Sequence, residues 1–325
     1  MRIMITGGAG YIGSIVTEVC LEIGDEVLVY DNLSTGHRKA VHQDARLVVG
    51  DVGDQELLTA TLTENRTEAV IHMAGFIEAG ESMKNPGKYF GNNTCRPVSL
   101  LEAMTATGVN RLLFSSTAAV YGDPVTEVLA EDHPQNPTNA YGESKLLFER
   151  ILDWYDRIHG IRHAALRYFN AAGASGERGE DHDPESHLSP LVLKTALGQR
   201  SHVEIYGTDY PTPDGTCIRD YIHVRDLAEA HLLALRRLDG DSLHYNLGNG
   251  QGYSVREVID TARVISGVDF EVRETGRRPG DPVSLVASSD TDKGELNWQP
   301  QNPSSYAIVS SAGEEHQSNT KDNHQ

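Results

Sequence analysis

The stretch RIMITGGAGYIGS, residues 2–14, decides the fold expected for this 325-residue chain. Residues 2–6 are apolar and suit a β-strand, and Gly7, Gly10 and Gly13 follow in a GxxGxxG turn that leads into a helical pattern over residues 11–24. A strand, a glycine turn and a helix in this order let backbone approach a pyrophosphate at a helix N-terminus. The stretch therefore predicts the first unit of a dinucleotide-binding domain.

Outward from this stretch, apolar segments alternate with helical patterns. The further strands expected are residues 26–30, 46–49, 69–73, 111–115 and 162–168, and helical patterns lie between them, notably at 88–107 and 141–159. Strands that alternate with helices predict an α/β fold with a doubly wound parallel sheet of the Rossmann type.

The character of the sequence changes after about residue 170. Polar, glycine-rich stretches at 173–187 and 207–216 predict loops, and a helical pattern lies between them at 188–199. We expect an NAD-binding domain over 1–170, to which 218–237 return, and a smaller, discontinuous mixed α/β substrate domain over 171–310. Residues 311–325 are polar and lack periodicity, which predicts a frayed, flexible tail.

The composition excludes several classes of protein. The chain carries a formal net charge of −19, and a protein this acidic binds nucleic acid or an anionic membrane poorly. No apolar run is long enough to span a membrane, and the N-terminus lacks the apolar core and cleavage site of a signal peptide. Cys20, Cys95 and Cys217 form no CxxC motif, so we expect unpaired thiols and a cytoplasmic location.

Two acidic residues follow predicted strands in the first half of the chain. Asp31 stands 18 residues after Gly13, where a carboxylate can bind the adenosine ribose and repel a 2′-phosphate, which favours NAD over NADP. Asp51 and Val52 follow the next strand, where a carboxylate can meet the adenine amino group. Each aspartate alone could equally be a turn residue at a strand end; with the glycines they predict dinucleotide binding.

Tyr141 and Lys145 are a second signal, because no other of the 13 tyrosines has a lysine four residues later. On a helix this spacing puts both side chains on one face. An ammonium group beside a phenol lowers a pKa that starts near 10, which makes the phenol usable as an acid or base at neutral pH. An exposed helix with a chance pair is the alternative for this spacing taken alone.

Hydroxyl side chains end the predicted strand before this helix. Ser115, Ser116 and Thr117 lie where a parallel strand presents its carboxyl end to a ligand, although turn chemistry at a strand end also selects such residues. Asn92 and Asn93 either lie on a helix surface or brace the same site.

Longer motifs extend these signals over most of the chain. They are GGAGYIGS at 7–14, DNLSTGH at 31–37, GES at 80–82, SSTAAVYGD at 115–123, YGESK at 141–145, RYFNAAGA at 167–174, YGTDYPTPDGTCIRDYIHVRDLA at 206–228 and GRRPGD at 276–281. With these motifs the chain resembles the extended short-chain dehydrogenase/reductase family, and more closely its UDP-glucose 4-epimerase branch, from residue 1 to about residue 303.

This resemblance implies an NAD-dependent isomerase that interconverts UDP-galactose and UDP-glucose at C4 through a transient 4-keto sugar, as in galactose metabolism. NAD would take the hydride from C4, return it to the other face and stay resident. Tyr141, as phenolate, would take the proton of the 4-hydroxyl and Thr117 would relay it, while Lys145 would hold the nicotinamide ribose and keep the pKa of Tyr141 low. The resemblance also implies a homodimer paired through helices near 88–107 and 141–159.

Binding residues are carried over from the resemblance position by position. NAD would be contacted by Gly7, Gly10, Tyr11, Ile12, Gly13, Asp31, Asn32, Asp51, Val52, Met73, Ala74, Gly75, Asn92, Ser115, Tyr141, Lys145 and Tyr168. The UDP-hexose would be contacted by Thr117, Tyr141, Asn170, His187, Leu188, Tyr206, Arg219, Tyr221, Arg278 and Asp281. The two arginines would clamp the diphosphate, Tyr206 would flank the uracil and Asp281 would take a ribose hydroxyl.

The chain departs from the family pattern at four positions. Thr117 stands where many members carry serine, and Ile77 where some carry a ribose-binding lysine, so that contact is missing. His187 stands where an asparagine is familiar, and either replaces the amide contact or faces solvent. Leu285 stands where some members carry a large tyrosine beside the sugar 2-substituent, which leads to the hypothesis that an N-acetyl group is admitted.

Other functions are disfavoured by particular residues. Asp181, His182, Asp183, Glu185 and His187 show no fixed ligand spacing, so no metal site is predicted. A sugar-nucleotide dehydratase would usually carry Asp-Glu after the threonine, where this chain has Ala118 and Ala119. A non-catalytic NAD sensor on the same fold need not retain Tyr141, Lys145 and Thr117.

Overall fold

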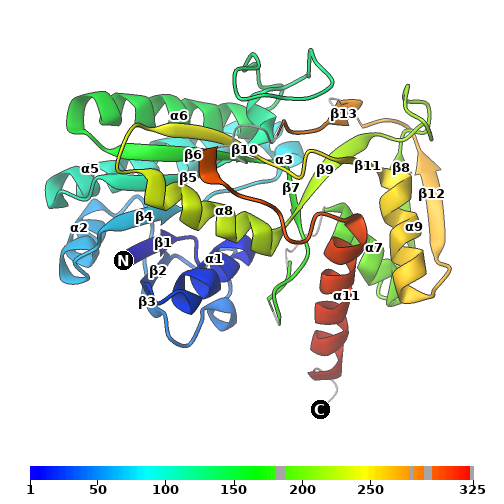
Figure 1. Ribbon diagram of the computed structural model, residues 1–325, viewed down its shortest axis with the longest axis horizontal. Coiled ribbons are helices and arrows are strands. Elements are labelled where there is room, and N and C mark those ends of the chain that lie inside the picture. Colours follow the sequence, from blue (N-terminus) through cyan, green and yellow to red (C-terminus); the bar gives the residue numbers. More distant parts are fainter. Residues whose placement is uncertain (177, 181–186, 279–280, 289–294, 323–325) are drawn as a thin grey trace.

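The computed structural model describes residues 1–176, 178–180, 187–278, 281–288 and 295–322, with residues 315–322 described by their backbone alone. A large sheet with flanking helices forms one part of the molecule, and a smaller part with its own helices lies beside it (Figure 1). The metal alternative at Asp181, His182, Asp183 and Glu185 lies outside the described residues.

Seven parallel strands form the large sheet, in the order β10-β6-β5-β4-β1-β2-β3 (Figure 1). They are β1 (Arg2–Thr6), β2 (Glu26–Asp31), β3 (Arg46–Val49), β4 (Ala69–His72), β5 (Arg111–Thr117), β6 (Arg162–Tyr168) and β10 (Leu243–Leu247). Strands buried on both faces read as continuous apolar runs, and β4 is buried at every residue. The doubly wound parallel sheet is confirmed. The order in which successive strands are added reverses between β1 and β4, and sheets of this type bind ligands at that switch point.

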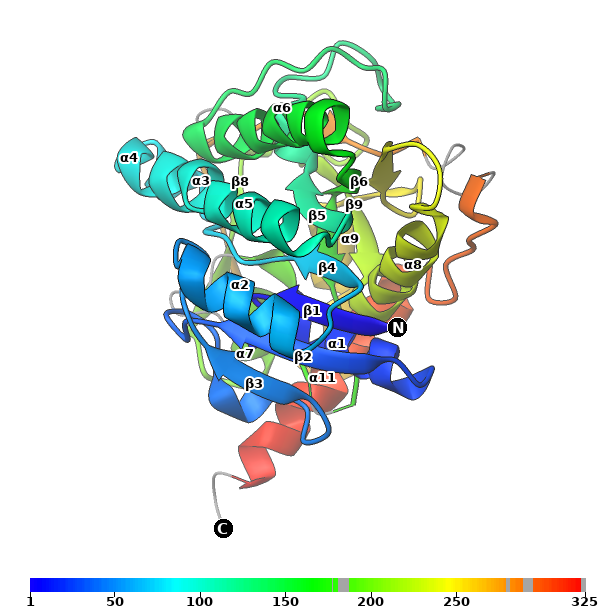
Figure 2. The same ribbon diagram turned by 90° about the vertical axis from the view of Figure 1, so that its left-hand side faces the viewer.

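Helices cover both faces of this sheet (Figure 2). Its helices are α1 (Tyr11–Glu22), α2 (Gln55–Glu64), α3 (Ala79–Ser82), α4 (Pro86–Tyr89), α5 (Pro97–Thr107), α6 (Ala140–His159) and α8 (Val224–Arg237), with short helices at Arg38–Ala40 and Ala118–Val120. Successive strand residues face opposite ways: Ile3 and Ile5 pack with α1 and α8, whereas Met4 packs with α2, α5 and α6.

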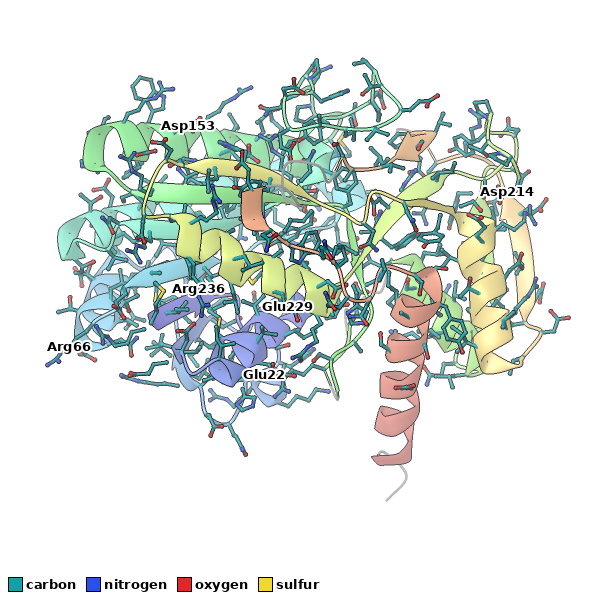
Figure 3. The ribbon with its side chains drawn as sticks, viewed as in Figure 1. Glu22, Arg66, Asp153, Asp214, Glu229 and Arg236 are labelled. Atoms are coloured by element: carbon teal, nitrogen blue, oxygen red, sulfur yellow. The ribbon has the colours of Figure 1, made fainter. Side chains whose placement is uncertain are left out.

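The chain returns to the large part after its excursion into the smaller one, and within the predicted segment 218–237 helix α8 makes this return. Helix α8 packs beside α1, where Arg225 pairs with Glu22 at 2.5 Å, and Glu22 and Glu229 mark the two helices in Figure 3. The expected return of 218–237 is corrected at both ends. Residues 218–223 form β9 of the smaller part, and residues 243–247, expected in the substrate domain, form edge strand β10 of the large sheet.

The smaller part is mixed α/β, as predicted. Strand β9 (Ile218–His223) pairs with β7 (Asn170–Ala172), β11 (Gly252–Ser254) and β13 (Ser284–Leu285), and β8 (His202–Tyr206) pairs with β12 (Glu271–Thr275). Helices α7 (Leu188–Ala196), α9 (Val255–Ser266) and α11 (Ser305–Asp322) complete it. These elements bury their own apolar cluster, which includes Val192, Ile205, Val258 and Ile308.

The C-terminal segment is helical where a frayed tail is predicted. Helix α11 runs through Asp322, because Ile308, Val309 and Ala312 are buried against α7 and α9 and provide a start from which the helix extends. Within the described residues, no helix combines the length and the apolar character that a membrane crossing requires.

Candidate active site

The parallel strands bring the predicted site residues to one edge of the sheet. Carboxyl ends of adjacent parallel strands meet at the same edge. There the glycine turn follows β1, Asp31 ends β2, Met73 to Gly75 follow β4, Ser115 to Thr117 end β5, and Tyr168 ends β6.

The glycine turn is close-packed at two positions and open at the third. Gly7 has a φ of +74°, and a Cβ there would lie 2.5 Å from the backbone nitrogen of Ala74. A Cβ at Gly13 would lie 2.3 Å from the carbonyl oxygen of Gly7. Gly10 is the N-cap of α1 and offers no side-chain cap, so the first N–H groups of the helix stay open to an anion. The turn fits a pyrophosphate.

Asp31 is fixed beside this turn. Its carboxylate accepts hydrogen bonds from the backbone N–H groups of Ala9 at 3.0 Å and Leu33 at 2.8 Å. A carboxylate has acceptor sites beyond these two, so Asp31 retains capacity for ribose hydroxyls while its charge opposes a 2′-phosphate.

Asp51 lies at the same edge in a network of its own. Its carboxylate pairs with Arg96 at 3.0 Å and accepts from the side chain of Asn32 at 3.0 Å and from the backbone of Gly53 at 2.8 Å. Val52 is buried. A contact with the adenine amino group would use a lone pair of the Asp51 carboxylate that these three partners do not occupy. This contact stays a prediction.

Helix α6 presents Tyr141 and Lys145 as the spacing predicts. The side chain of Asn139 caps the helix by accepting from the backbone of Gly142 at 2.8 Å. The side chain of Tyr141 lies beside that of Thr117 and interacts with it. The Nζ of Lys145 donates to the carbonyl oxygen of Ser115 at 2.8 Å. The helix thus places an acid/base candidate, a hydroxyl partner and a cation at the end of β5.

The predicted direction of the Tyr141 pKa is wrong. Burial raises the pKa of Tyr141, the interaction with Thr117 lowers it, and the charge of Glu78 raises it further, so the net direction is upward. Burial also lowers the pKa of Lys145 to about 8, against an opposing effect of Glu149. The local spacing could not show this, because burial is the largest influence on this pKa and outweighs any lowering by the lysine.

Asn93 braces the site from a π-helix over Phe90–Cys95, a helix type frequent at functional sites. Its amide bonds both the N–H and the C=O of Phe76 at 2.9 Å and donates to the hydroxyl of Ser144 at 3.1 Å. Asn92 donates to the Oδ1 of Asn93 at 3.1 Å. Of the two asparagines, Asn93 is the brace, and the sequence signal for both was equal.

Tyr168 is held by a histidine that the sequence does not single out. The Nδ1–H of His231 donates to the carbonyl oxygen of Leu227 at 2.7 Å, which leaves Nε2 to accept from the Tyr168 hydroxyl. Burial raises the pKa of Tyr168 and lowers that of His231 to about 4, so both are neutral at pH 7. The sequence spacing around His231 does not connect it to the site, because α8 comes to lie beside Tyr168 only when the chain returns from the smaller part.

The predicted substrate residues fall into three groups in the smaller part. Arg219 pairs with Asp281 at 2.6 Å, Arg278 stacks over the ring of Tyr206 at 3.8 Å, and Asn170 lies opposite Tyr221 across β7 and β9.

The remaining substrate candidates are less closely tied to these groups. His187 pairs with Glu180 at 2.7 Å and precedes α7, which begins at Leu188. The structure therefore gathers Arg219 with Asp281 and Tyr206 with Arg278, whereas His187 has a carboxylate partner of its own.

Together, the open glycine turn and the tyrosine, lysine and threonine at the end of β5 define an NAD-dependent enzyme of the short-chain dehydrogenase type. Residues 3–248 match the NAD dependent epimerase/dehydratase family, and the chain belongs to this family.

Similar proteins cover almost the whole chain. A UDP-glucose 4-epimerase of Lacticaseibacillus casei is 46% identical over 98% of this chain and 97% of its own length. One from Halalkalibacterium halodurans is 48% identical over 96% of this chain and 94% of its own. The crystal structure of UDP-glucose 4-epimerase from Brucella ovis in complex with NAD superposes with a TM-score of 0.94, at 42% identity, over 96% of this chain and 97% of that one.

Proposed function

We propose that this chain interconverts UDP-galactose and UDP-glucose by epimerisation at C4, with NAD as a resident cofactor. The observation that carries the proposal is the placement of Tyr141 beside the Thr117 side chain at the end of β5, where buried Lys145 donates to the carbonyl oxygen of Ser115 at 2.8 Å. Ala118 and Ala119 follow Thr117 and supply no acid for elimination. Relatives named UDP-glucose 4-epimerase match 96% and 98% of the chain.

The residues present fit NAD. The N-terminus of α1 at Gly10 to Gly13 would hold the pyrophosphate, Asp31 the adenosine ribose, and Lys145 the nicotinamide ribose. A Cβ at Gly75 would lie 3.2 Å from the Nζ of Lys145, so glycine at this position leaves space beside the ammonium group. When bound, NAD supplies the acceptor, and later the donor, of the hydride at C4.

Side chains of the protein carry out the proton transfer. Tyr141, once deprotonated, takes the proton of the sugar 4-hydroxyl, and Thr117 relays it between the sugar and the phenol oxygen. Lys145 remains mostly charged at pH 7, below its pKa of about 8, and its charge favours the phenolate when a ligand closes the site. The same groups return the proton after the 4-keto sugar has turned.

The smaller part holds the nucleotide of the substrate. Arg219 and Arg278 would bind the diphosphate oxygens, and Asp281, now paired with Arg219, would share that arginine with the phosphates and accept from the uridine ribose. Tyr206, under Arg278, would flank the uracil. Asn170, Tyr221, His187 and Leu188 would line the sugar side.

The direct experiment is to incubate the purified protein with UDP-galactose, without added NAD, and to measure UDP-glucose. We expect product to form and nucleotide absorbance to co-purify with the protein. Denatured protein in the same buffer is the control. Failure to form UDP-glucose, even after NAD is supplied, would contradict the proposed function.

The side chain at position 285 is expected to determine which 2-substituent of the sugar the site accepts. It is half-buried in β13, opposite Arg219, and packs on the apolar cluster that includes Ala118 and Tyr121. We expect the unaltered protein to turn over UDP-N-acetylglucosamine as well as UDP-glucose. Leu285→Tyr should lower kcat/KM for UDP-N-acetylglucosamine, relative to kcat/KM for UDP-glucose, at least about tenfold, because the ring fills the space for the acetamido group.

Leu285→Met is the matched control for this prediction, because it conserves volume. Its ratio of kcat/KM values should stay close to that of the unaltered protein. An unchanged ratio in Leu285→Tyr would remove Leu285 from the determinants of specificity.

We further propose a cytoplasmic homodimer. Trp154 and Ile158 are 59% and 66% exposed on one stretch of α6, and a second copy would cover them. Ile158→Asp is therefore expected to shift the protein from dimer to monomer in sedimentation velocity. A dimer that persists in this variant would place the interface elsewhere. The described cysteines are all free, which supports the cytoplasmic location.

A further inference from the structure

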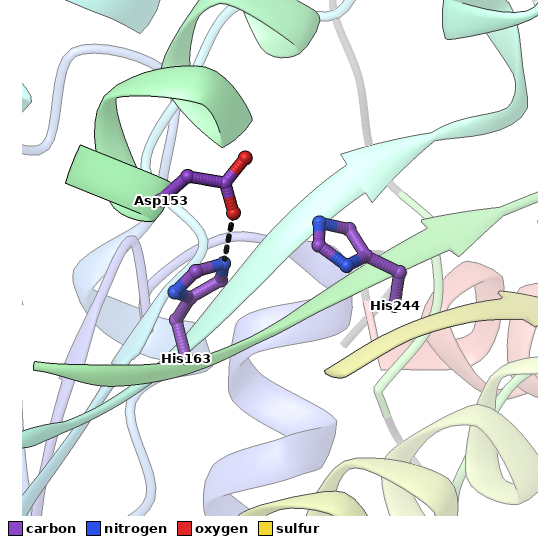
Figure 4. A group of neighbouring side chains, drawn as sticks. All are labelled: Asp153, His163 and His244. Atoms are coloured by element: carbon purple, nitrogen blue, oxygen red, sulfur yellow. Dashed lines mark ion pairs between the residues drawn. The ribbon is translucent and has the colours of Figure 1, made fainter. Parts of the chain in front are cut away.

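Two histidines and an aspartate converge far from the carboxyl edge of the sheet. His163 is the second residue of β6, His244 is the second residue of β10, and Asp153 reaches them from α6 (Figure 4). One ligand atom from each residue lies within 4.8 Å of the other two. Because β6 and β10 are parallel, this cluster lies at their amino ends, opposite the end at Tyr168 that belongs to the active site.

His163 has unused bonding capacity inside the protein. Its side chain is fully buried, and neither ring nitrogen makes a hydrogen bond with any residue that the structure describes. Its Nε2 points at the Oδ1 of Asp153 at 3.5 Å, the ion pair drawn in Figure 4. A buried imidazole that lacks hydrogen bonds is costly and uncommon, so this one calls for a ligand.

A further carboxylate lies beside the cluster and already has a cationic partner. Nearby, the Oε2 of Glu149 lies 3.9 Å from the Nε2 of His244, and Arg167 neutralises that carboxylate at 2.7 Å.

An adjoining cavity provides access. It has a volume of about 230 Å³, and Asp153 and His244 line it together with Glu131, Glu149 and Arg150. The cavity leaves room for a water molecule as a fourth ligand. His244 and Asp153 have side chains that are 31% and 41% exposed, so both can rotate toward the fixed ring of His163.

We propose that Asp153, His163 and His244 bind a divalent transition metal of the zinc class, with water as the fourth ligand. Zinc takes histidine and carboxylate ligands at about 2.0–2.2 Å in a tetrahedron, which places neighbouring ligand atoms about 3.3 Å apart, close to the 3.5 Å between His163 and Asp153. Two imidazoles favour zinc, cobalt or nickel over magnesium and calcium, which prefer oxygen ligands.

The bound ion joins three elements of the large part. Asp153 belongs to α6, the helix that carries Tyr141 and Lys145, and the histidines belong to edge strand β10 and its neighbour β6. In Figure 3, Asp153 lies on the outer helix above these strands. A ligand that binds only the folded state stabilises it in proportion to its occupancy, so the ion holds α6 to the edge of the sheet.

The test is Co²⁺ binding to the full-length, chelator-treated protein in a Cys95→Ser background, which removes an exposed thiol. We expect one Co²⁺ per chain with the visible absorption of a tetrahedral site, displacement by Zn²⁺, no displacement by Mg²⁺, and a rise of several degrees in Tm with Zn²⁺. His244→Gln and Asp153→Asn should each weaken binding by more than the roughly 10- to 100-fold that loss of an outer hydrogen-bond partner costs.

His159→Gln is the matched control, because this exposed histidine lies on the same helix, outside the cluster. It should leave Co²⁺ affinity unchanged, and the epimerase activity of all three variants should persist, which shows that they fold. The proposal is overturned if the protein binds no Co²⁺, if the spectrum is octahedral, or if both His244→Gln and Asp153→Asn bind as tightly as the background protein.

Discussion

Tyr141→Phe is expected to lower kcat for UDP-galactose by about 100- to 10,000-fold, the range that a positioned general acid or base contributes. The substitution keeps the ring, which packs edge-on to Tyr89 with centroids 6.5 Å apart, and keeps the backbone hydrogen bond to the Ser82 hydroxyl at 3.1 Å. It removes only the hydroxyl group that interacts with Thr117. Steady-state kinetics in both directions would measure the loss.

Two comparisons separate chemistry from folding in this variant. The co-purified NAD content should match that of the unaltered protein, because Lys145 and the glycine turn remain in place. Tyr306→Phe, at a tyrosine that is 58% exposed on α11, removes a hydroxyl from the smaller part, outside the predicted site, and should retain full activity. Full activity in Tyr141→Phe would rule out the proposed proton transfer.

Much of the larger part of the fold can be predicted from local patterns. Strands buried on both faces, such as residues 69–72, read as apolar runs, and the glycines punctuate β1 and α1. Edge strand β10 is different, because its sequence LHYNL alternates and its partner β6 lies far back in the chain. The sequence does not predict helix α11, because only Ile308, Val309 and Ala312 anchor it, and three apolar residues are too few to define a helical period.

Some features of the site can likewise be predicted from local sequence patterns, whereas others depend on contacts between distant segments. Spacing alone predicts that Tyr141 and Lys145 share a face, and strand ends predict Asp31 and Thr117. Spacing does not predict that His231 holds Tyr168 or that burial sets the direction of the Tyr141 pKa. Those facts depend on which distant segments close over the sheet, and the cluster of Asp153, His163 and His244 arises in the same way.

Arg167→Leu is expected to destabilise the protein by about 3–5 kcal/mol, the usual cost of removing one partner of a buried ion pair. Arg167 and Glu149 are 2% and 3% exposed, and the guanidinium binds both carboxylate oxygens, at 2.7 and 3.2 Å. Arg167 also donates to the Tyr121 hydroxyl at 2.9 Å. The loss is a large share of a typical stability of about 5–15 kcal/mol, and urea unfolding would measure it.

Two further variants test whether the buried charge is the cause. The double variant Glu149→Leu/Arg167→Leu leaves no carboxylate uncompensated, so it should recover much of the loss. Arg256→Leu removes an exposed pair with Glu274 at 2.9 Å and should cost less than about 1 kcal/mol. If the double variant is less stable than Arg167→Leu, the pair stabilises the protein through its geometry and not merely by neutralising a charge.

The same pair links stability to the active site. The Ser116 hydroxyl donates to Glu149, and Ser116 precedes Thr117 on β5, while Glu149 follows Lys145 by one helical turn on α6. The ion pair therefore fixes both elements that meet at the reacting groups. We expect the folded double variant to have a lower kcat with its NAD content retained, because its core is neutral but Ser116 has lost its acceptor.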